Sequence, residues 1–161
     1  RERYFRAAQA IKDELIQQHW NGQQLARVVG KQGRLGEGVL EDYAYVAKGL
    51  LDWASLTDSK QDWRNAELMI RQAWDRFYTK QGWILAENML LRYGSGQEAI
   101  ADGPMPSAAG VLIHSTMVLL KQSPDKKLML KAKLALSSGH KLITNEAFWY
   151  ASYVRQMRLM K

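Results

Sequence analysis

The chain contains no cysteine among its 161 residues, which excludes a disulfide framework, a thiolate nucleophile and a CxxC redox pair. Histidine is scarce: there are three, and none has a second histidine at a spacing that would hold a metal ion. The glycine-containing run GKQGRLGEG lacks the GxxxxGK[ST] pattern of a phosphate-binding loop. We therefore expect neither a metal site nor a cofactor.

The sequence also has no apolar run long enough to cross a membrane. Its first residues follow an amphipathic helical pattern and do not resemble a signal peptide. These features predict a soluble, cytoplasmic protein with no membrane partner. The length and the 47% apolar content fit one domain over residues 1–161, and because Arg1 stands inside a helical pattern, we expect this domain to belong to a longer polypeptide.

Positive charge is in excess: the chain has 23 Lys and Arg against 16 Asp and Glu, a net charge of +7. Such a balance is typical of proteins that bind nucleic acid, because Lys and Arg neutralise phosphate. Here, however, the basic residues of 126–141 and 155–161 alternate with apolar residues, as on the solvated outer face of a helix. Nucleic acid is therefore not the expected partner.

Apolar residues recur every three or four positions in six segments, which predicts six helices. The turns after the second and fourth helices are tight, whereas the other connections are longer, so the long loops collect at one end of the bundle. This pattern predicts an all-α fold of three helical hairpins, forming about half of an (α/α)6 toroid with small β-hairpin-like loops at one end. The expected helices cover residues 1–18, 40–56, 63–77, 107–121, 125–138 and 146–160.

Two of the long connections contain strand-like runs. Residues 23–39 hold two short extended runs around a glycine-containing turn, which predicts a small β-hairpin. The runs GWILA at 82–86 and NMLLRYG at 88–94 predict a second strand pair. Both predicted strand pairs lie at the end of the bundle where the long loops collect.

Prolines and a serine mark the starts of the later helices. Pro104 and Pro106 disfavour regular helix before them, and Ser107 can cap the helix that follows. Pro124 is predicted in the first turn of the next helix, where its missing N–H costs no hydrogen bond.

The stretch from residue 36 to residue 54 organises the rest of the chain. A glycine-rich turn places Glu41 and Asp42 in the first turn of a largely apolar helix. The helix macrodipole stabilises negative charge at that end, which is one reason for the two acids. The alternative is that they face a cleft. The buried face of this helix is predicted to consist of Leu40, Tyr43, Ala44, Ala47, Leu50, Leu51 and Ala54.

Two motifs resemble the C-terminal region of the YyaL-like and spermatogenesis-associated thioredoxin-domain proteins. The first is LGEGVLEDYAYVAKGLLDW, in which residues 38–44 match the family pattern of a glycine, a large apolar residue, an acid pair and Tyr-Ala. The second is DGPMPSAAGVLIHSTMVLL, in which Asp102, Gly103, Pro106 and Ser107 match. The family's Gly-Asn after the serine is replaced here by Ala-Ala-Gly at residues 108–110.

The resemblance implies a six-hairpin α/α barrel related to the N-acylglucosamine and cellobiose 2-epimerases. It also implies an upstream thioredoxin-like domain and another half-barrel, so that the main partner of this chain is the remainder of its own polypeptide. A half-barrel by itself would expose apolar faces, and we therefore expect the isolated chain to self-associate.

Four residues are candidates for catalysis. Glycoside chemistry uses carboxylates paired across a cleft, and Asp42 or Glu41 would pair with Asp102. Because epimerases that resemble this fold use histidine bases, His114 is the fourth candidate. Each has a structural alternative: the acid pair stabilises a helix start, Asp102 forms a turn before Gly103, and His114 packs in the core.

Six further residues are candidates for substrate binding. Aromatic rings can stack on sugars, hydroxyls can bind them, and arginines in the two long loops could hold an anionic group; their alternatives are core packing for the aromatic residues and solvent exposure for the arginines. These residues are Tyr43, Ser107, Arg27, Arg92, Trp20 and Trp83.

Two functions follow as hypotheses. In the first, the chain binds or processes a small carbohydrate, with isomerase, epimerase-like or glycosidase-like chemistry. In the second, it is a helical interaction or scaffold domain without catalysis. The Ala-Ala-Gly departure at residues 108–110 and the lack of a histidine pair favour the second hypothesis.

Overall fold

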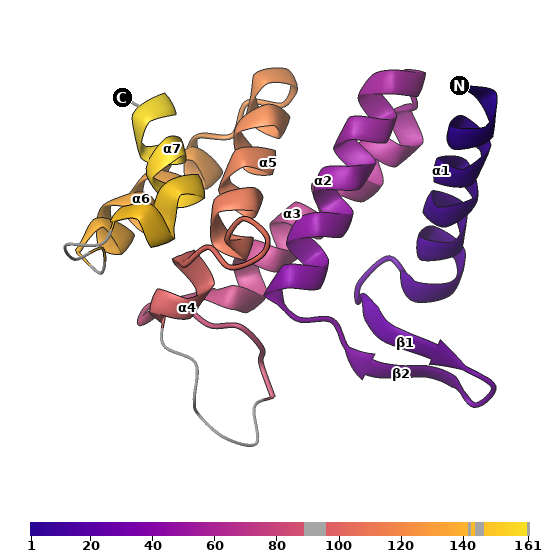
Figure 1. The fold of residues 1–161 in the computed structure, drawn as a ribbon, viewed down its shortest axis with the longest axis horizontal. Coiled ribbons are helices and arrows are strands. Elements are labelled where there is room, and N and C mark those ends of the chain that lie inside the picture. The colour runs from indigo at the N-terminus through magenta and orange to yellow at the C-terminus, as the bar shows by residue number, and fades with distance from the viewer. Residues whose placement is uncertain (89–95, 142, 144–146, 161) are drawn as a thin grey trace.

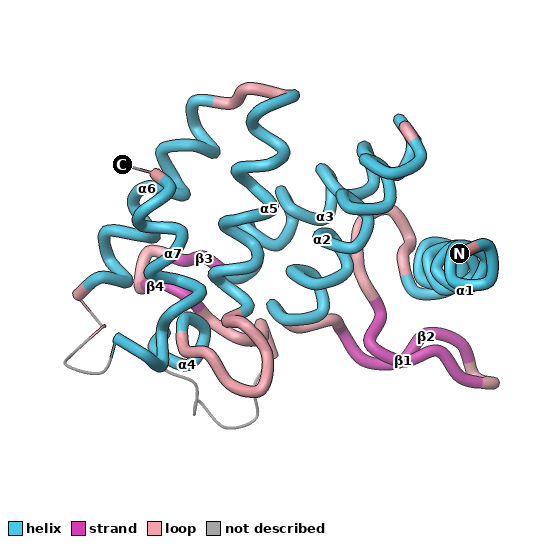
Figure 2. The backbone as a smooth tube through the Cα atoms, turned by 45° about the horizontal axis from the view of Figure 1, so that its top comes forward, coloured by secondary structure: helices cyan, strands magenta, loops and turns pink. Residues whose placement is uncertain are grey.

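The computed structural model describes residues 1–88, 96–141, 143 and 147–160. Most of these residues are helical, as predicted, and two small antiparallel β-sheets lie in the connections (Figures 1 and 2). The α-helices are α1 (Glu2–Glu14), α2 (Leu40–Thr57), α3 (Lys60–Phe77), α4 (Gly96–Ile100), α5 (Ala108–Gln122), α6 (Lys126–His140) and α7 (Ala151–Leu159). The strands are β1 (Ala26–Gly30), β2 (Gly33–Glu37), β3 (Tyr78–Thr79) and β4 (Gly82–Trp83).

The longer helices form two layers. Helices α2, α5 and α7 run in the same direction and begin at the same end of the molecule, where α4 and the β1–β2 hairpin also lie (Figure 1). Helices α3 and α6 run back behind them, and α1 lies beside α2 (Figures 1 and 2). The predicted gathering of the connections at one end is therefore present among the described residues.

The core centres on the contact of α2 with α3 and α5. All seven residues predicted for the buried face of α2 are buried. The rings of Tyr43 and Phe77 meet edge to face, 5.5 Å apart. Trp74 of α3 donates a 2.8 Å hydrogen bond through its indole Nε1 to the Thr116 hydroxyl of α5, so a polar contact also fixes these two helices.

The predicted hairpin in residues 23–39 is present, with Val28 of β1 opposite Leu35 of β2. It also stabilises the end of the first helical segment, which finishes in a π-helical turn over Leu15–His19. The guanidinium of Arg34 donates to the carbonyls of Gln17, Gln18 and Trp20, which lack partners within the helix. One side chain from β2 thus holds the end of the N-terminal helix.

The second predicted strand pair is wrong in its pairing. Gly82–Trp83 pairs with Tyr78–Thr79, in a tight hairpin directly after α3. Residues 84–86 are not in a strand, and apart from Asn88 the run 88–94 lies outside the described residues. Helix α4 was also not predicted: it ends at Ile100, four residues before Pro104, where the restriction imposed by a proline no longer acts.

Two further predictions need correction. The last helix begins with a 3₁₀ turn over Ala147–Tyr150, and only Ala151–Leu159 is α-helical. Pro124 precedes the helix, because Asp125 is the N-cap and its carboxylate accepts from the first backbone amides. Helix α1 buries none of its residues, and one of its contacts with α2 is between the rings of Phe5 and Trp53, whose centroids lie 4.8 Å apart.

Gly139 on α6 is predicted to be intolerant of substitution. A methyl group there would lie 2.5 Å from the Tyr153 ring and hydroxyl, and it would displace the 2.7 Å hydrogen bond from that hydroxyl to the Ala135 carbonyl. Gly139→Ala should therefore lower the free energy of unfolding by about 1–3 kcal/mol, measured by urea denaturation. The matched control is Gly49→Ala in the middle of α2, where no atom lies within 4 Å; it should stabilise by about 0.5–1 kcal/mol. Equal effects of the two substitutions would contradict this packing.

Candidate functional site

Asp102 joins the beginnings of α5 and α7. Its Oδ1 accepts a 2.8 Å hydrogen bond from the backbone N–H of Ser107, the N-cap of α5. Its Oδ2 accepts a 2.8 Å bond from the N–H of Ser152 in the first turn of α7, and the Ser152 hydroxyl donates to Oδ1. The carboxylate is thus occupied by three donors, and the fold brings residues fifty positions apart into one cluster.

The first turn of α5 packs directly against this cluster. The two hydroxyls of Ser107 and Ser152 lie 2.8 Å apart, and the N–H of Gly110 donates to the Ser107 hydroxyl. A Cβ atom at Gly110 would lie 2.6 Å from the first hydroxyl and 2.9 Å from the second. The sequence Ala-Ala-Gly therefore places its glycine where α5 and α7 approach most closely.

Glu41 and Asp42 have different environments although they are adjacent. The Asp42 carboxylate accepts a 2.9 Å hydrogen bond from the N–H of Val39 and lies 3.7 Å from Nε of Arg27. It therefore stabilises the start of α2, as the helix-dipole interpretation predicts. The exposed Glu41 side chain instead lines a cleft.

This cleft consists of two adjoining cavities that share Glu41 and Leu85, and we call it the loop-end cleft. The first cavity, about 490 Å³, lies between the hairpin and residues 85–88. The second, about 370 Å³, lies against α4 and the start of α5. The backbone N–H of Leu40 donates a 2.9 Å hydrogen bond to the carbonyl of Leu85, so the start of α2 is joined to a residue that lines both cavities. Their polar lining residues are Arg27, Glu37, Glu41, Glu87, Asn88, Glu98 and Ser107.

Some of these polar groups already have partners. The Asn88 amide donates a 3.1 Å hydrogen bond to Glu37, and Glu87 accepts from Arg76 at 2.5 Å. Glu41 and Glu98 make no hydrogen bond or ion pair among the described residues. They are therefore the carboxylates that the cleft offers to a ligand.

Tyr45 is a polar residue near the cleft that is not among the residues predicted from the sequence. Its hydroxyl donates a 2.7 Å hydrogen bond to the Pro106 carbonyl and so ties α2 to the loop before α5. Burial raises its pKa, and the charges of Glu41 and Asp102 raise it further, so the hydroxyl stays protonated and remains a donor. Its position four residues after Glu41, on the same side of the helix, was the available signal.

The predicted aromatic binding residues are not at the cleft surface. Tyr43 is buried in the core, where its hydroxyl accepts a 2.9 Å hydrogen bond from the N–H of Leu25 and burial raises its pKa. Trp20 and Trp83 are 5% and 4% exposed, and Trp83 packs against Trp74 with ring centroids 5.0 Å apart. The prediction that these rings offer a face to a sugar is corrected: they fill the core.

Of the other residues predicted for the site, some line the cleft and some do not. Arg27 and Ser107 line the cleft, whereas Arg92 lies outside the described residues. His114 lies two turns into α5 and lines neither cavity. Its side chain is half-buried; this burial, together with the nearby charge of Arg155, lowers its pKa.

The comparisons with known proteins add no assignment. No protein-family model and no curated protein matches the chain. Within the described ranges, no group of three or more His, Asp or Glu side chains is arranged to hold a metal ion. No helix in the same ranges combines the length and the apolar character that crossing a membrane requires.

The chemistry that this arrangement can support is binding by hydrogen bonds. Acid–base catalysis at a sugar requires two carboxyl groups on opposite sides of the reacting bond. Asp102 joins the starts of α5 and α7, and Asp42 stabilises the start of α2, which leaves Glu41 and Glu98 as the cleft carboxylates without a partner among the described residues. The predicted pairing of Asp42 with Asp102 across a cleft is therefore replaced by a cleft in which Glu41 is the central acid.

The three hydrogen bonds to Asp102 give the first test of the site. Asp102→Asn keeps the shape of the side chain but replaces one acceptor oxygen by a donor that faces other donors. We expect the free energy of unfolding to fall by about 1–3 kcal/mol in urea denaturation. Glu98→Gln makes the same chemical change at an exposed residue of α4 and should be nearly neutral. An unchanged free energy of unfolding in Asp102→Asn would show that the carboxylate does not hold the two helices.

A pH dependence follows from His114. Because its pKa in the folded protein is lowered below the usual 6.5, the folded state favours the neutral ring more than the unfolded state does. This contribution to stability is complete above pH 6.5 and is lost as the pH falls below it. Between pH 7.5 and 5.5 the wild type should therefore lose more stability than His114→Gln, with His140→Gln as the control for an exposed imidazole. Parallel pH profiles of wild type and His114→Gln would contradict this assignment.

Proposed function

We propose that the chain binds a small polyhydroxylated molecule, of the carbohydrate class, in the loop-end cleft. The observation that carries the proposal is the meeting of two cavities at Glu41, beside the first turns of α2 and α5. In this proposal the helices form the C-terminal part of an α/α toroid of the YyaL-like type, and the rest of the polypeptide completes the cleft.

The size and chemistry of the cleft support this choice. Cavities of about 490 and 370 Å³ fall within the usual range for small-molecule sites. Polyols carry hydroxyls that both donate and accept, and the cleft offers the acceptors Glu41 and Glu98 and the donor Arg27. Leu85 and the prolines of the neighbouring loop add apolar surface for the C–H faces of a sugar ring.

Binding is better supported than catalysis by this chain alone. Among the described residues, the cleft carboxylates without a partner are Glu41, which lines both cavities, and Glu98, which lines the second. No hydrogen bond within the described ranges orients either of them for proton transfer, so we expect the rest of the polypeptide to complete any catalytic pair. An isomerase, epimerase-like or glycosidase-like activity is therefore proposed only for a complete barrel.

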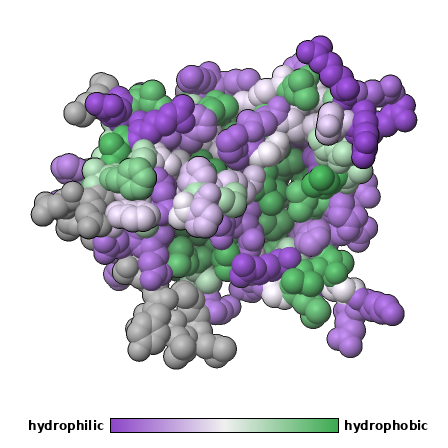
Figure 3. Space-filling view, in the orientation of Figure 1, coloured by the Kyte–Doolittle hydropathy of each residue, from purple (hydrophilic) through white to green (hydrophobic). Residues whose placement is uncertain are grey.

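A second candidate, a helical interaction domain, is favoured by one feature. An apolar groove of about 370 Å³ runs between α1 and α2, lined by Ile11, Leu15, Val46 and Trp53 among others, and Ile11 is 62% exposed. Apolar side chains gather on this face of the molecule (Figure 3). Exposed apolar patches usually mark interfaces, so this groove suits the expected contact with the rest of the polypeptide or with a second copy.

Titration of isotope-labelled protein with a panel of neutral monosaccharides and alditols, followed by NMR, tests the first candidate. We expect saturable shifts of the amides of Glu41, Leu85 and Ser107 with at least one member of the panel. Glu41→Gln should weaken that ligand about tenfold, because it removes a charged acceptor at the centre of the cleft. Asp42→Asn is the matched control; it should reduce stability and leave the affinity unchanged.

The outcomes separate the two candidates. Shifts confined to Ile11 and Trp53, or no response to any member of the panel, would favour the interaction domain. A saturable ligand whose affinity is the same in the wild type and in Glu41→Gln would place binding outside the loop-end cleft.

A further inference from the structure

The excess positive charge of the protein comes from its last 36 residues. Residues 126–161 contain eight Lys or Arg and one acid, which gives +7, whereas residues 1–125 contain fifteen of each sign and are neutral. The net charge of +7 is therefore a property of the α6–α7 region and not of the whole surface.

Helix α6 carries half of these basic residues and contains no acid. Lys131 pairs with Asp75 of α3 at 3.0 Å. Lys126, Lys127 and Lys133 are exposed, and none of them lies within ion-pair distance of an acid among the described residues. Three lysines on one helix are thus exposed and outside any ion pair of the described residues.

The same helix has a second apolar stripe that does not face the core. The inward stripe consists of buried residues, which include Leu128, Ala132 and Leu136. Leu130 and Leu134, one turn apart, are instead 58% and 56% exposed. A solvated outer face accounts for the lysines but gives no reason for two neighbouring leucines among them. We call Lys126, Lys127, Leu130, Lys133 and Leu134 the outer α6 face.

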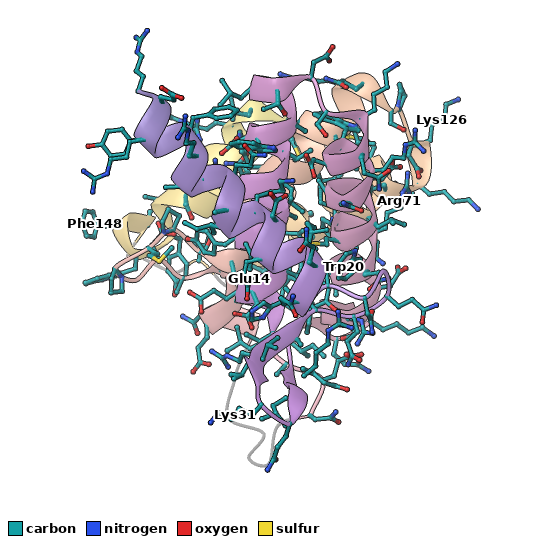
Figure 4. All side chains as sticks on the ribbon, turned by 90° about the vertical axis from the view of Figure 1, so that its right-hand side faces the viewer. Glu14, Trp20, Lys31, Arg71, Lys126 and Phe148 are labelled. Atoms are coloured by element: carbon teal, nitrogen blue, oxygen red, sulfur yellow. The ribbon has the colours of Figure 1, made fainter. Side chains whose placement is uncertain are left out.

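This face points away from the molecule and is separate from the loop-end cleft. Helix α6 belongs to the layer behind α2, α5 and α7, and the Lys126 side chain projects outward from it (Figures 1 and 4). Arg155 of α7, whose charge acts on His114 of α5, does not belong to this face.

We propose that the outer α6 face is a docking surface for anionic lipid membranes. The partner is inferred from the lysines together with the exposed pair Leu130 and Leu134. An anionic bilayer surface takes lysines at its headgroups and leucines at the headgroup–acyl boundary, which is the pattern of an interfacial amphipathic helix. A nucleic acid would bind the lysines, but its phosphates gain nothing from leucines.

A protein partner fits this face less well than a bilayer does. Leu130 and Leu134 line none of the cavities found among the described residues, and the one cavity that reaches this face, about 290 Å³ beside Lys127, is lined mainly by charged residues. In the described part of the chain, the leucine pair therefore has no groove beside it that would receive a partner side chain. A bilayer surface requires no such groove. Surface docking of this kind requires no membrane-spanning segment, so the earlier expectation of no membrane partner, which depended on spanning runs, does not bear on it.

Co-sedimentation of the chain with lipid vesicles tests the proposal. We expect binding to vesicles of phosphatidylcholine with about 30% phosphatidylserine, and much weaker binding to phosphatidylcholine alone. Each lysine near an anionic surface contributes about fivefold, so the triple variant Lys126→Gln/Lys127→Gln/Lys133→Gln should bind about a hundredfold more weakly. Leu130→Ser/Leu134→Ser should also weaken binding at unchanged charge.

Two control variants test whether vesicle binding depends on this face or only on the net charge and the exposed apolar surface of the protein. Lys31→Gln/Lys60→Gln/Lys80→Gln removes the same charge from exposed lysines elsewhere, and Leu56→Ser/Leu68→Ser removes two exposed leucines elsewhere. Both should bind vesicles like the wild type. Equal loss in the two lysine variants, no effect of Leu130→Ser/Leu134→Ser, no vesicle binding, or tighter binding to duplex DNA than to vesicles would each overturn the proposal.

Discussion

The carboxylate of Asp102 is the constraint on which the functional end of this molecule depends. It accepts hydrogen bonds from Ser107 and Ser152 and so holds the first turns of α5 and α7 against each other. Their contact is close enough that Gly110 has room only for hydrogen. The loop that carries Asp102 is tied in turn to α2, because Tyr45 donates to the Pro106 carbonyl. Three parallel helices therefore begin at one end (Figure 1), and the loop-end cleft lies there, against the starts of α2 and α5.

Local pattern was sufficient to predict the helix at the centre of this arrangement. The three-and-four-residue spacing in residues 40–56 identified every buried residue of α2, because a helix packed on one side buries one stripe. Ser107 was correctly predicted as a cap, since capping depends on neighbours in sequence. The hairpin at β1 and β2 followed from a glycine turn between two extended runs. These features need only local information.

The predictions that failed concern tertiary contacts, which the local sequence pattern does not show. Nothing near Asp102 in the sequence indicates Ser152 as its partner, so its role as a link between α5 and α7 could not be predicted. Trp20 and Trp83 stand in connections, which suggested exposed rings, yet both are buried: Trp20 lies against Tyr43 of α2, and Trp83 against Trp74 of α3. The acid pair was predicted correctly at the start of α2, but the sequence could not show which of the two acids faces the cleft.

The two proposed binding surfaces lie on different parts of the molecule. The cleft lies at the loop end, and the outer α6 face lies on the layer behind α2, α5 and α7 (Figure 1). Both the fold of the loop end and the position of the cleft depend on one carboxylate, which joins the starts of α5 and α7. Backbone amide hydrogen exchange at Ser107 and Ser152, followed by NMR, tests this link most directly. Both amides should be protected as strongly as buried amides within α5, and both should lose protection together in Asp102→Ala while Met69 in α3 keeps its own. Exchange of either amide at the rate of an unstructured peptide in the wild type would contradict the account.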